Sequence, residues 1–164
     1  MKKILLLLLA AFTFSGCEKD DICTDETTPQ LVIEFYDVSN PTTLKNVAGL
    51  KITGDGMPTE LNTFSGVSTI KLPLDVTGDS VKYSMILNSS SPTNANEDFL
   101  QFNYTRNNVY VSRACGYRTI FELNSPGGVI HTDSATPDLL WIQSFDVQTT
   151  TIDTENEIHL KIYF

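Results

Sequence analysis

The sequence predicts an all-β protein whose strands form a single antiparallel β-sandwich. Apolar and polar residues alternate with a period of two through most of the chain, and no stretch repeats at the spacing of a long helix. Clusters of Gly, Pro, Asn and Asp separate the alternating stretches at short intervals. We expect about eight or nine short strands in one immunoglobulin-like or transthyretin-like domain over residues 29–164. A closed β-barrel is the alternative, which uneven strand lengths and the long polar loop 88–97 disfavour.

The clearest alternation marks stretches that are each expected to bury one face and expose the other. They are residues 31–36, 81–87, 100–105 and 158–164. In the last stretch His159 falls on the outward face, where we expect it to be solvated. Trp141 lies in the apolar run 139–142 and is predicted to belong to the core.

Turn-forming residues place the connections between these strands. Thr105-Arg106-Asn107-Asn108 is predicted to be a tight hairpin turn, because Asn tolerates a positive φ. Further turns are expected at residues 54–56, 77–79 and 126–128. Pro73 cannot donate a hydrogen bond to a neighbouring strand, so its strand either ends there or lies at a sheet edge.

The start of the chain is typical of an exported lipoprotein. Two lysines precede an apolar run at residues 4–12, and Ser15-Gly16-Cys17 follows as a lipobox. The run is too short to span a bilayer, which takes about 20 apolar residues. We expect residues 1–16 to be removed as a signal peptide and acyl chains such as palmitate to be attached to Cys17. Residues 17–28 then form a lipidated acidic tether; an ordinary secreted protein cut elsewhere is the alternative.

The residues after Cys17 give a more specific address. Lys19-Asp20-Asp21 resembles the export signal of Bacteroidota surface lipoproteins, a lysine and two acidic residues behind the lipidated cysteine. The resemblance implies an outer-membrane protein that faces the medium, with the periplasmic face of the same membrane as the alternative. Two or more acyl chains anchor a protein stably.

The two remaining cysteines, Cys23 and Cys115, are predicted to form a disulfide in an oxidising compartment. They lie 92 positions apart, so the bond would contribute about 4–5 kcal/mol in the chain-entropy model. Two free thiols are the alternative. With the bond in place only residues 18–22 remain as a tether, which reaches at most ~17 Å and keeps the domain close to the membrane.

The charge of the chain excludes one class of partner. The formal net charge is −9, and removal of Lys2 and Lys3 with the signal peptide makes it −11. So acidic a protein repels phosphate backbones, and we expect no binding of nucleic acid. We also expect it to avoid an anionic membrane surface, which leaves the lipid on Cys17 as the expected membrane contact.

The inventory of catalytic side chains is poor. Ser68 and Lys71 have a Ser-x-x-Lys spacing, but the stretch alternates like a strand and places them on opposite faces. His131 and Asp133 could offer two ligands from one loop, which is too few for a zinc site. We therefore expect no enzymatic activity, no metal and no cofactor.

Outward aromatic residues are the best candidates for binding. Tyr36, Tyr110 and Tyr163 are predicted to face away from the core, where they could stack on sugar rings or on a protein partner. The alternative is that they are scattered singly as strand-forming residues. Ser80 and Ser134 each follow an Asp and resemble the O-glycosylation acceptors of Bacteroidota, with Ser134 favoured because it is expected in a loop.

Three segments together suggest a family. Residues 28–37, Leu72-Pro73-Leu74 and residues 112–117 resemble an uncharacterised family of Bacteroidota outer-membrane lipoproteins, over nearly the whole mature chain. The family has no known activity, and the resemblance implies a partner such as an outer-membrane barrel protein. We therefore expect a non-enzymatic accessory lipoprotein that docks beside a membrane partner. A surface glycan-binding module is the alternative.

Overall fold

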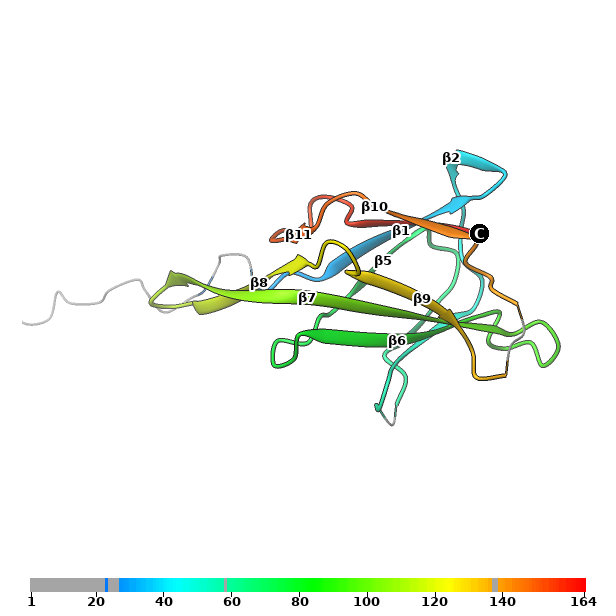
Figure 1. Cartoon of the computed structure of the whole chain (residues 1–164), viewed down its shortest axis with the longest axis horizontal. Helices are drawn as coiled ribbons and strands as arrows, with labels where there is room; N and C mark the ends of the chain where they lie inside the picture. The colour runs from blue at the N-terminus through cyan, green and yellow to red at the C-terminus, as the bar shows by residue number, and fades with distance from the viewer. Residues whose placement is uncertain (1–22, 24–26, 58, 137–138) are drawn as a thin grey trace, which may run out of the picture.

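The computed structural model describes residues 23, 27–57, 59–136 and 139–164. These residues form two β-sheets that pack face to face, and no helix occurs among them (Figure 1). The predicted all-β sandwich is confirmed, and the closed barrel is not formed by the part of the chain described. There are twelve strands in this part rather than the eight or nine expected.

The five-stranded sheet is built around the first strand of the domain. Its order is β10 (Ser144–Val147), β12 (Leu160–Tyr163), β1 (Leu31–Asp37) and β2 (Asn40–Leu44), and β5 (Thr69–Leu72) also pairs with β1. β1 and β12 run parallel, with Ile33 opposite Leu160. The other pairs in this sheet are antiparallel. β5 ends directly before Pro73, as predicted.

The seven-stranded sheet carries the longest strand of the protein. Its order is β11 (Thr151–Ile152), β8 (Gly116–Leu123), β7 (Asn96–Ser112), β6 (Ser80–Leu87), β3 (Leu50–Gly54) and β4 (Asn62–Phe64), and β9 (Val129–Asp133) also pairs with β7. β7 has β6 and β9 as neighbours only as far as Asn103. From Tyr104 onward β8 is the only strand that pairs with it in the described chain.

Alternation along the strands fills the space between the sheets as predicted. Leu31, Ile33 and Phe35 of β1 are fully buried against apolar side chains of the other sheet. Trp141 is also buried, its ring centroid lies 5.5 Å from that of Phe164, and its Nε1 donates to a carbonyl of β6 at 2.9 Å. The predicted turns at 77–79 and 126–128 lie between strands, and the turn predicted at 54–56 begins with the last residue of β3. The polar loop predicted at 88–97 also follows β6, but β7 begins within it at Asn96.

The hairpin turn predicted at residues 105–108 is wrong. β7 continues through this stretch, and the chain turns at Arg113-Ala114-Cys115, where Gly116 has a φ of 69°. Asn108 stays in the strand because it lies opposite Thr119, whose hydroxyl donates to its Oδ1 at 2.9 Å. Residues 105–108 are polar because β7 has here passed the ends of β6 and β9 and exposes its side chains on both faces. Thr119 and Phe121, which lie opposite in β8, stay buried.

The prediction that His159 is solvated is also wrong. His159 lies on the outward face of its sheet, as expected, but it is completely buried. Its Nδ1 accepts a hydrogen bond from the Val32 N–H at 2.8 Å. The segment between β11 and β12 returns across this face, where Glu155 accepts from the Gln30 N–H at 2.9 Å and pairs with Lys71 at 2.8 Å. Alternation within one strand could not predict the burial of His159, because a loop covers this face of the sheet.

Candidate functional site

The β7–β8 hairpin extends beyond the ends of β6 and β9, as Figure 1 shows. We call residues 109–118 the hairpin tip. The turn of this hairpin and the C-terminus lie at opposite ends of the described chain (Figure 1). A two-stranded ribbon is only marginally stable in water, so the hairpin tip needs support from elsewhere.

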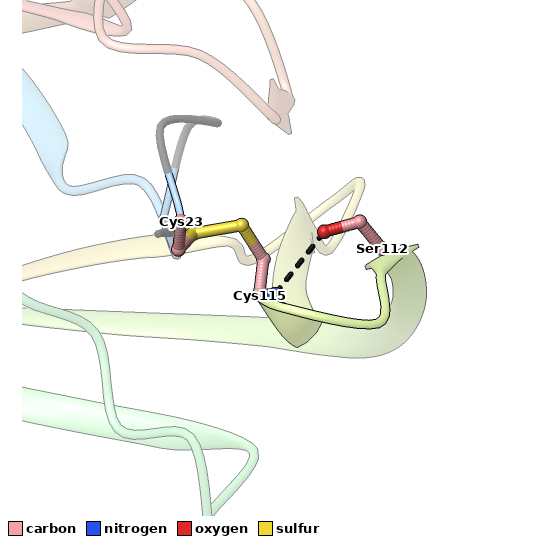
Figure 2. The surroundings of a disulfide bond; sticks show 3 residues. All are labelled: Cys23, Ser112 and Cys115. Atoms are coloured by element: carbon pink, nitrogen blue, oxygen red, sulfur yellow. Dashed lines mark hydrogen bonds between the residues drawn. A yellow bond between two sulfur atoms is a disulfide. The ribbon is translucent and has the colours of Figure 1, made fainter. Parts of the chain in front are cut away.

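A disulfide supplies that support at the end of the hairpin. Cys115, in the turn, is bonded to Cys23, with a Cα–Cα distance of 4.9 Å (Figure 2). The predicted bond is therefore confirmed. The Cys115 N–H also donates to Ser112 Oγ at 3.1 Å, and the Thr119 N–H donates to Thr28 Oγ1 at 3.0 Å. The chain before the domain is thus fastened to the β7–β8 hairpin at two points, one in the turn and one in β8.

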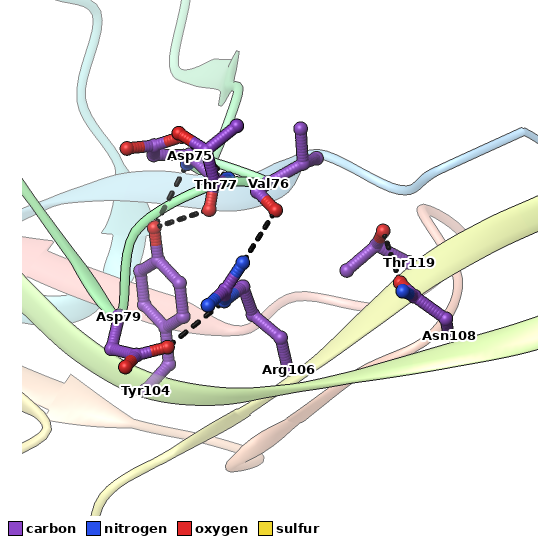
Figure 3. A network of polar contacts seen from close by, with 8 residues as sticks. All are labelled: Asp75, Val76, Thr77, Asp79, Tyr104, Arg106, Asn108 and Thr119. Carbon is purple, nitrogen blue, oxygen red and sulfur yellow. Dashed lines mark hydrogen bonds and ion pairs between the residues drawn. The ribbon is translucent and has the colours of Figure 1, made fainter.

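A polar network holds the base of the hairpin where it leaves the sandwich (Figure 3). Arg106 Nε pairs with Asp79 at 2.9 Å, and its Nη1 donates to the Val76 carbonyl at 2.6 Å. Beside it the Tyr104 hydroxyl accepts a hydrogen bond from the Asp75 N–H at 2.8 Å. Burial raises the pKa of Tyr104 to about 12, so this hydroxyl stays protonated. The network fixes the direction in which the ribbon projects.

The hairpin tip presents a pair of tyrosines. Tyr110 and Tyr117 lie opposite each other on β7 and β8, their ring centroids are 5.4 Å apart, and they are 54% and 70% exposed. Tyr110 was expected on the outward face, but β7 does not turn at 105–108, so Tyr110 shares the core-facing side with Phe102. It is exposed because the hairpin overhangs the sandwich. Sequence analysis missed Tyr117, because the misplaced turn hid its pairing with Tyr110.

The charge of the hairpin differs from that of the rest of the chain. All three arginines of the protein, Arg106, Arg113 and Arg118, lie in it, and residues 99–121 contain no Asp or Glu. Arg106 is paired at the base, and Arg113 and Arg118 both lie in the hairpin tip. Arg113 lies in the exposed part of the turn. The sequence alone already contains this signal, as a long stretch without acidic residues.

The other two predicted tyrosines form a second aromatic pair. Tyr36 and Tyr163 lie opposite each other on β1 and β12, half-buried on the outer face, with ring centroids 5.6 Å apart. Lys161 Nζ lies 5.3 Å from the Tyr36 ring centroid. The Tyr36 hydroxyl donates to Glu34 at 2.7 Å, which raises the pKa of Tyr36 to about 12. The structure therefore brings two of the three tyrosines together and leaves Tyr110 elsewhere.

His131, which was expected in a loop, lies in β9 and has a structural contact. Its Nε2 lies 2.8 Å from Oδ2 of the fully buried Asp98. The Ile142 N–H also donates to Asp98, at 2.9 Å, and the Trp141 N–H lies 3.4 Å from its other oxygen. Burial raises the pKa of Asp98, and these donors oppose the shift. Within the described residues no three His, Cys, Asp or Glu side chains converge as metal ligands would.

The remaining predicted sites occupy ordinary surface positions. Ser80 is exposed at the start of β6, and Ser134 lies in the loop after β9, where its hydroxyl donates to the Thr136 carbonyl at 2.5 Å. Lys71 on β5 pairs with Glu155, and this pair borders a polar depression beside Pro29.

The predicted lipidation and export residues, Cys17 and Lys19-Asp20-Asp21, lie outside the described residues. None of the residues that the structure describes forms a helix long and apolar enough to cross a bilayer.

Comparison with known proteins matches residues 49–164 to the Family of unknown function (DUF6452). No curated protein and no solved structure matches the chain. The match includes the whole β7–β8 hairpin and two of the segments that suggested a family, and it begins after the third, residues 28–37.

Proposed function

We propose a function from the residues themselves, because the chain belongs to the Family of unknown function (DUF6452), whose description supplies none. The protein is a non-enzymatic accessory lipoprotein of the Bacteroidota, anchored in the outer membrane through a lipid on Cys17. It docks beside a membrane partner, for which an outer-membrane barrel protein is the first candidate. Its location is the cell surface, with the periplasmic face as the alternative.

One observation carries the proposal, namely the bond between Cys23 and the hairpin turn. Cys23 follows Cys17 by six positions, a stretch of chain that reaches at most about 20 Å. A lipid on Cys17 would therefore hold the end of the β7–β8 hairpin near the bilayer. So short a connection suits a protein that acts on a neighbour in the same membrane.

The electrostatics of the domain support the same class of function. The full chain carries a net charge of −9, and loss of Lys2 and Lys3 with the signal peptide makes it −11. This negative charge disfavours nucleic acid as a partner. The buried Asp98 carboxylate contacts three nitrogen atoms, of His131, Trp141 and Ile142. Lys71 Nζ and a carboxylate oxygen of Glu155 form an ion pair at 2.8 Å. These charged groups stabilise the fold and are not poised for catalysis.

Replacement of the lipidated cysteine tests the anchor. We expect Cys17→Ala to move the protein from the membrane fraction to the soluble fraction without loss of fold, because the core forms entirely downstream. Cell fractionation followed by circular dichroism measures both effects. Ser134→Ala is the matched control and should stay membrane-bound. A Cys17→Ala protein that remains on membranes after a salt wash would contradict the single lipid anchor.

Docking needs a separate experiment. Affinity purification of the anchored protein in mild detergent should recover an outer-membrane barrel protein in stoichiometric amount. A preparation that contains the acylated protein and no partner would leave the anchor standing and refute the docking.

A glycan-binding module is the second candidate, favoured by the Tyr36–Tyr163 pair on the outer face of the five-stranded sheet. Tyrosine faces flanked by Glu34 and Lys161 offer both stacking and hydrogen bonding to a sugar. Glycan-array binding that is lost in Tyr163→Ser and retained in Tyr117→Ser would favour this candidate over the accessory protein.

A further inference from the structure

We propose that the hairpin tip is a second membrane contact, lying against the phosphate-bearing headgroups of the membrane that holds the lipid. This inference rests on the proposed lipid anchor and extends it, since a net negative charge alone would keep the domain away from phosphate. The argument depends on where the hairpin tip is held, on its side chains and on its local charge.

Position comes first, because the hairpin tip is covalently held near the anchor. Cys115 lies in the turn between β7 and β8, and its disulfide joins it to Cys23. The Thr28–Thr119 hydrogen bond fastens the same stretch of chain farther along β8. The hairpin turn is therefore bonded directly to the residue that follows Cys17 by six positions.

The side chains of the hairpin tip suit the interface between water and lipid. Tyr110 and Tyr117 are more than half exposed, although they lie on the face of the hairpin that farther along is buried in the core. Tyrosine combines an apolar ring with a polar hydroxyl, and it is enriched where membranes meet water. Two such rings packed edge to face form an amphipathic surface at the end of the molecule.

Charge selects phosphate as the chemistry of the partner. Arg113 is exposed in the turn, and no acidic residue lies between Asp98 and Glu122. The guanidinium group forms paired hydrogen bonds with phosphate oxygens. Because the tether itself contains acidic residues, the contact depends on this local geometry more than on net attraction, and zwitterionic phospholipids should support it.

The base of the hairpin makes the contact directional. Arg106, paired with Asp79 and the Val76 carbonyl, fixes the ribbon to the segment before β6. With the hairpin tip on the membrane, the opposite end of the sandwich, where the chain ends beside Tyr163, faces away from the bilayer (Figure 1). The Tyr36–Tyr163 pair therefore serves as an internal control.

Tryptophan fluorescence at each end of the sandwich tests the inference. The acylated full-length mature protein is reconstituted in phosphatidylcholine vesicles as Tyr117→Trp and, separately, as Tyr163→Trp. The native Trp141 is buried and gives the background, which the parent protein measures. Brominated phosphatidylcholine should quench most of the fluorescence of the tryptophan at position 117 and little of the fluorescence of the tryptophan at position 163. Arg113→Glu in the Tyr117→Trp protein should reduce the quenching.

The outcomes separate the two proposals. Vesicle-bound, acylated protein without quenching at position 117 would overturn the membrane contact and leave the lipid anchor intact. A mature protein without acyl chains on Cys17, shown by mass spectrometry, would overturn the anchor itself. Equal quenching at both positions would also refute the oriented contact. In native membranes, position 117 could instead cross-link to another protein while lipid fails to quench its fluorescence. That result would show that the hairpin tip contacts a protein partner and not lipid.

Discussion

His159 shows how one side chain can couple this fold to pH. Its Nδ1 accepts the Val32 N–H, so that a neutral ring carries its proton on Nε2. Burial lowers the pKa of His159, and the acidic residues of the neighbouring segment, Glu157, Asp153 and Glu155, oppose the shift. The folded protein therefore favours the neutral imidazole more strongly than the unfolded chain does.

The expected consequence is a loss of stability at mildly acidic pH. The pKa of His159 is ordinary, about 6.5, in the unfolded chain and lower in the folded protein. As the pH falls below about 6.5, the unfolded chain binds the proton first, so the free energy of unfolding decreases down to the folded-state pKa. His159→Asn keeps an acceptor for the Val32 N–H and should flatten this dependence.

Urea unfolding between mildly acidic and neutral pH measures the effect. The exposed Ser80→Ala protein is the control and should follow the parent. A His159→Asn protein with the parent's full acid dependence would show that other groups cause it.

The β7–β8 hairpin owes part of its stability to contacts with other segments of the chain. Beyond Arg106 it is a two-stranded ribbon, because β11 pairs with β8 only at Phe121 and Glu122. The Arg106 network holds it at one end and the disulfide at the other. Removing the disulfide in Cys23→Ser/Cys115→Ser should lower the free energy of unfolding by about 4 kcal/mol, from lost constraint on the unfolded chain. Amide exchange should accelerate in residues 106–119 and stay slow in residues 98–102, which have strands on both sides.

Hydrogen exchange followed by mass spectrometry measures the exchange rates of both regions in one experiment. Reduction of the parent protein is the matched control and should reproduce the pattern. Unchanged exchange in the hairpin after loss of the disulfide would mean that the base network alone holds it, and two alkylatable thiols in the unreduced parent would remove the premise.

Sequence patterns predicted several of the strands that bury a face, and gave no signal for a strand that buries none. β1, β7 and β12 alternate because their inner residues fill the core. β2 is exposed at every position, so only hydrogen bonding to β1 makes it a strand, and no burial pattern marks it. The turn at 105–108 was misplaced for a related reason, since β7 is exposed at every one of these positions and shows no burial pattern there.

The candidate site was predictable to the extent that it depends on residue type. Parity of cysteines in an oxidising compartment predicted the Cys23–Cys115 bond. Outward alternation singled out Tyr36 and Tyr163, although not their pairing. Tyr117 required the correct hairpin register, which depends on long-range pairing of β7 and β8. The buried contacts of Asp98 and His159 depend on segments distant in sequence, so no local pattern could reveal them.

For the protein as a unit, one expectation concerns the side of the membrane that it faces. If Lys19-Asp20-Asp21 acts as a surface-export signal, protease added to intact cells should digest the domain. Replacement of these three residues by Ala should protect it, because the lipoprotein would then stay inside the outer membrane. Immunoblotting against a periplasmic control protein gives the measurement, and equal protection of both forms would place the protein on the periplasmic face.

The parallel pairing of β1 with β12 determines the order in which the protein can be assembled. Val32 and His159 meet across 127 positions of chain, whereas the hairpins of the seven-stranded sheet, apart from β11, come from residues 50–133. Nearby segments pair before distant ones. During synthesis or threading across a membrane, the apolar β1 therefore waits beside a half-built sandwich until residue 160 arrives. A lesion in β12 should therefore reduce the yield of folded protein by exposing β1 to aggregation, even where it barely changes the finished structure.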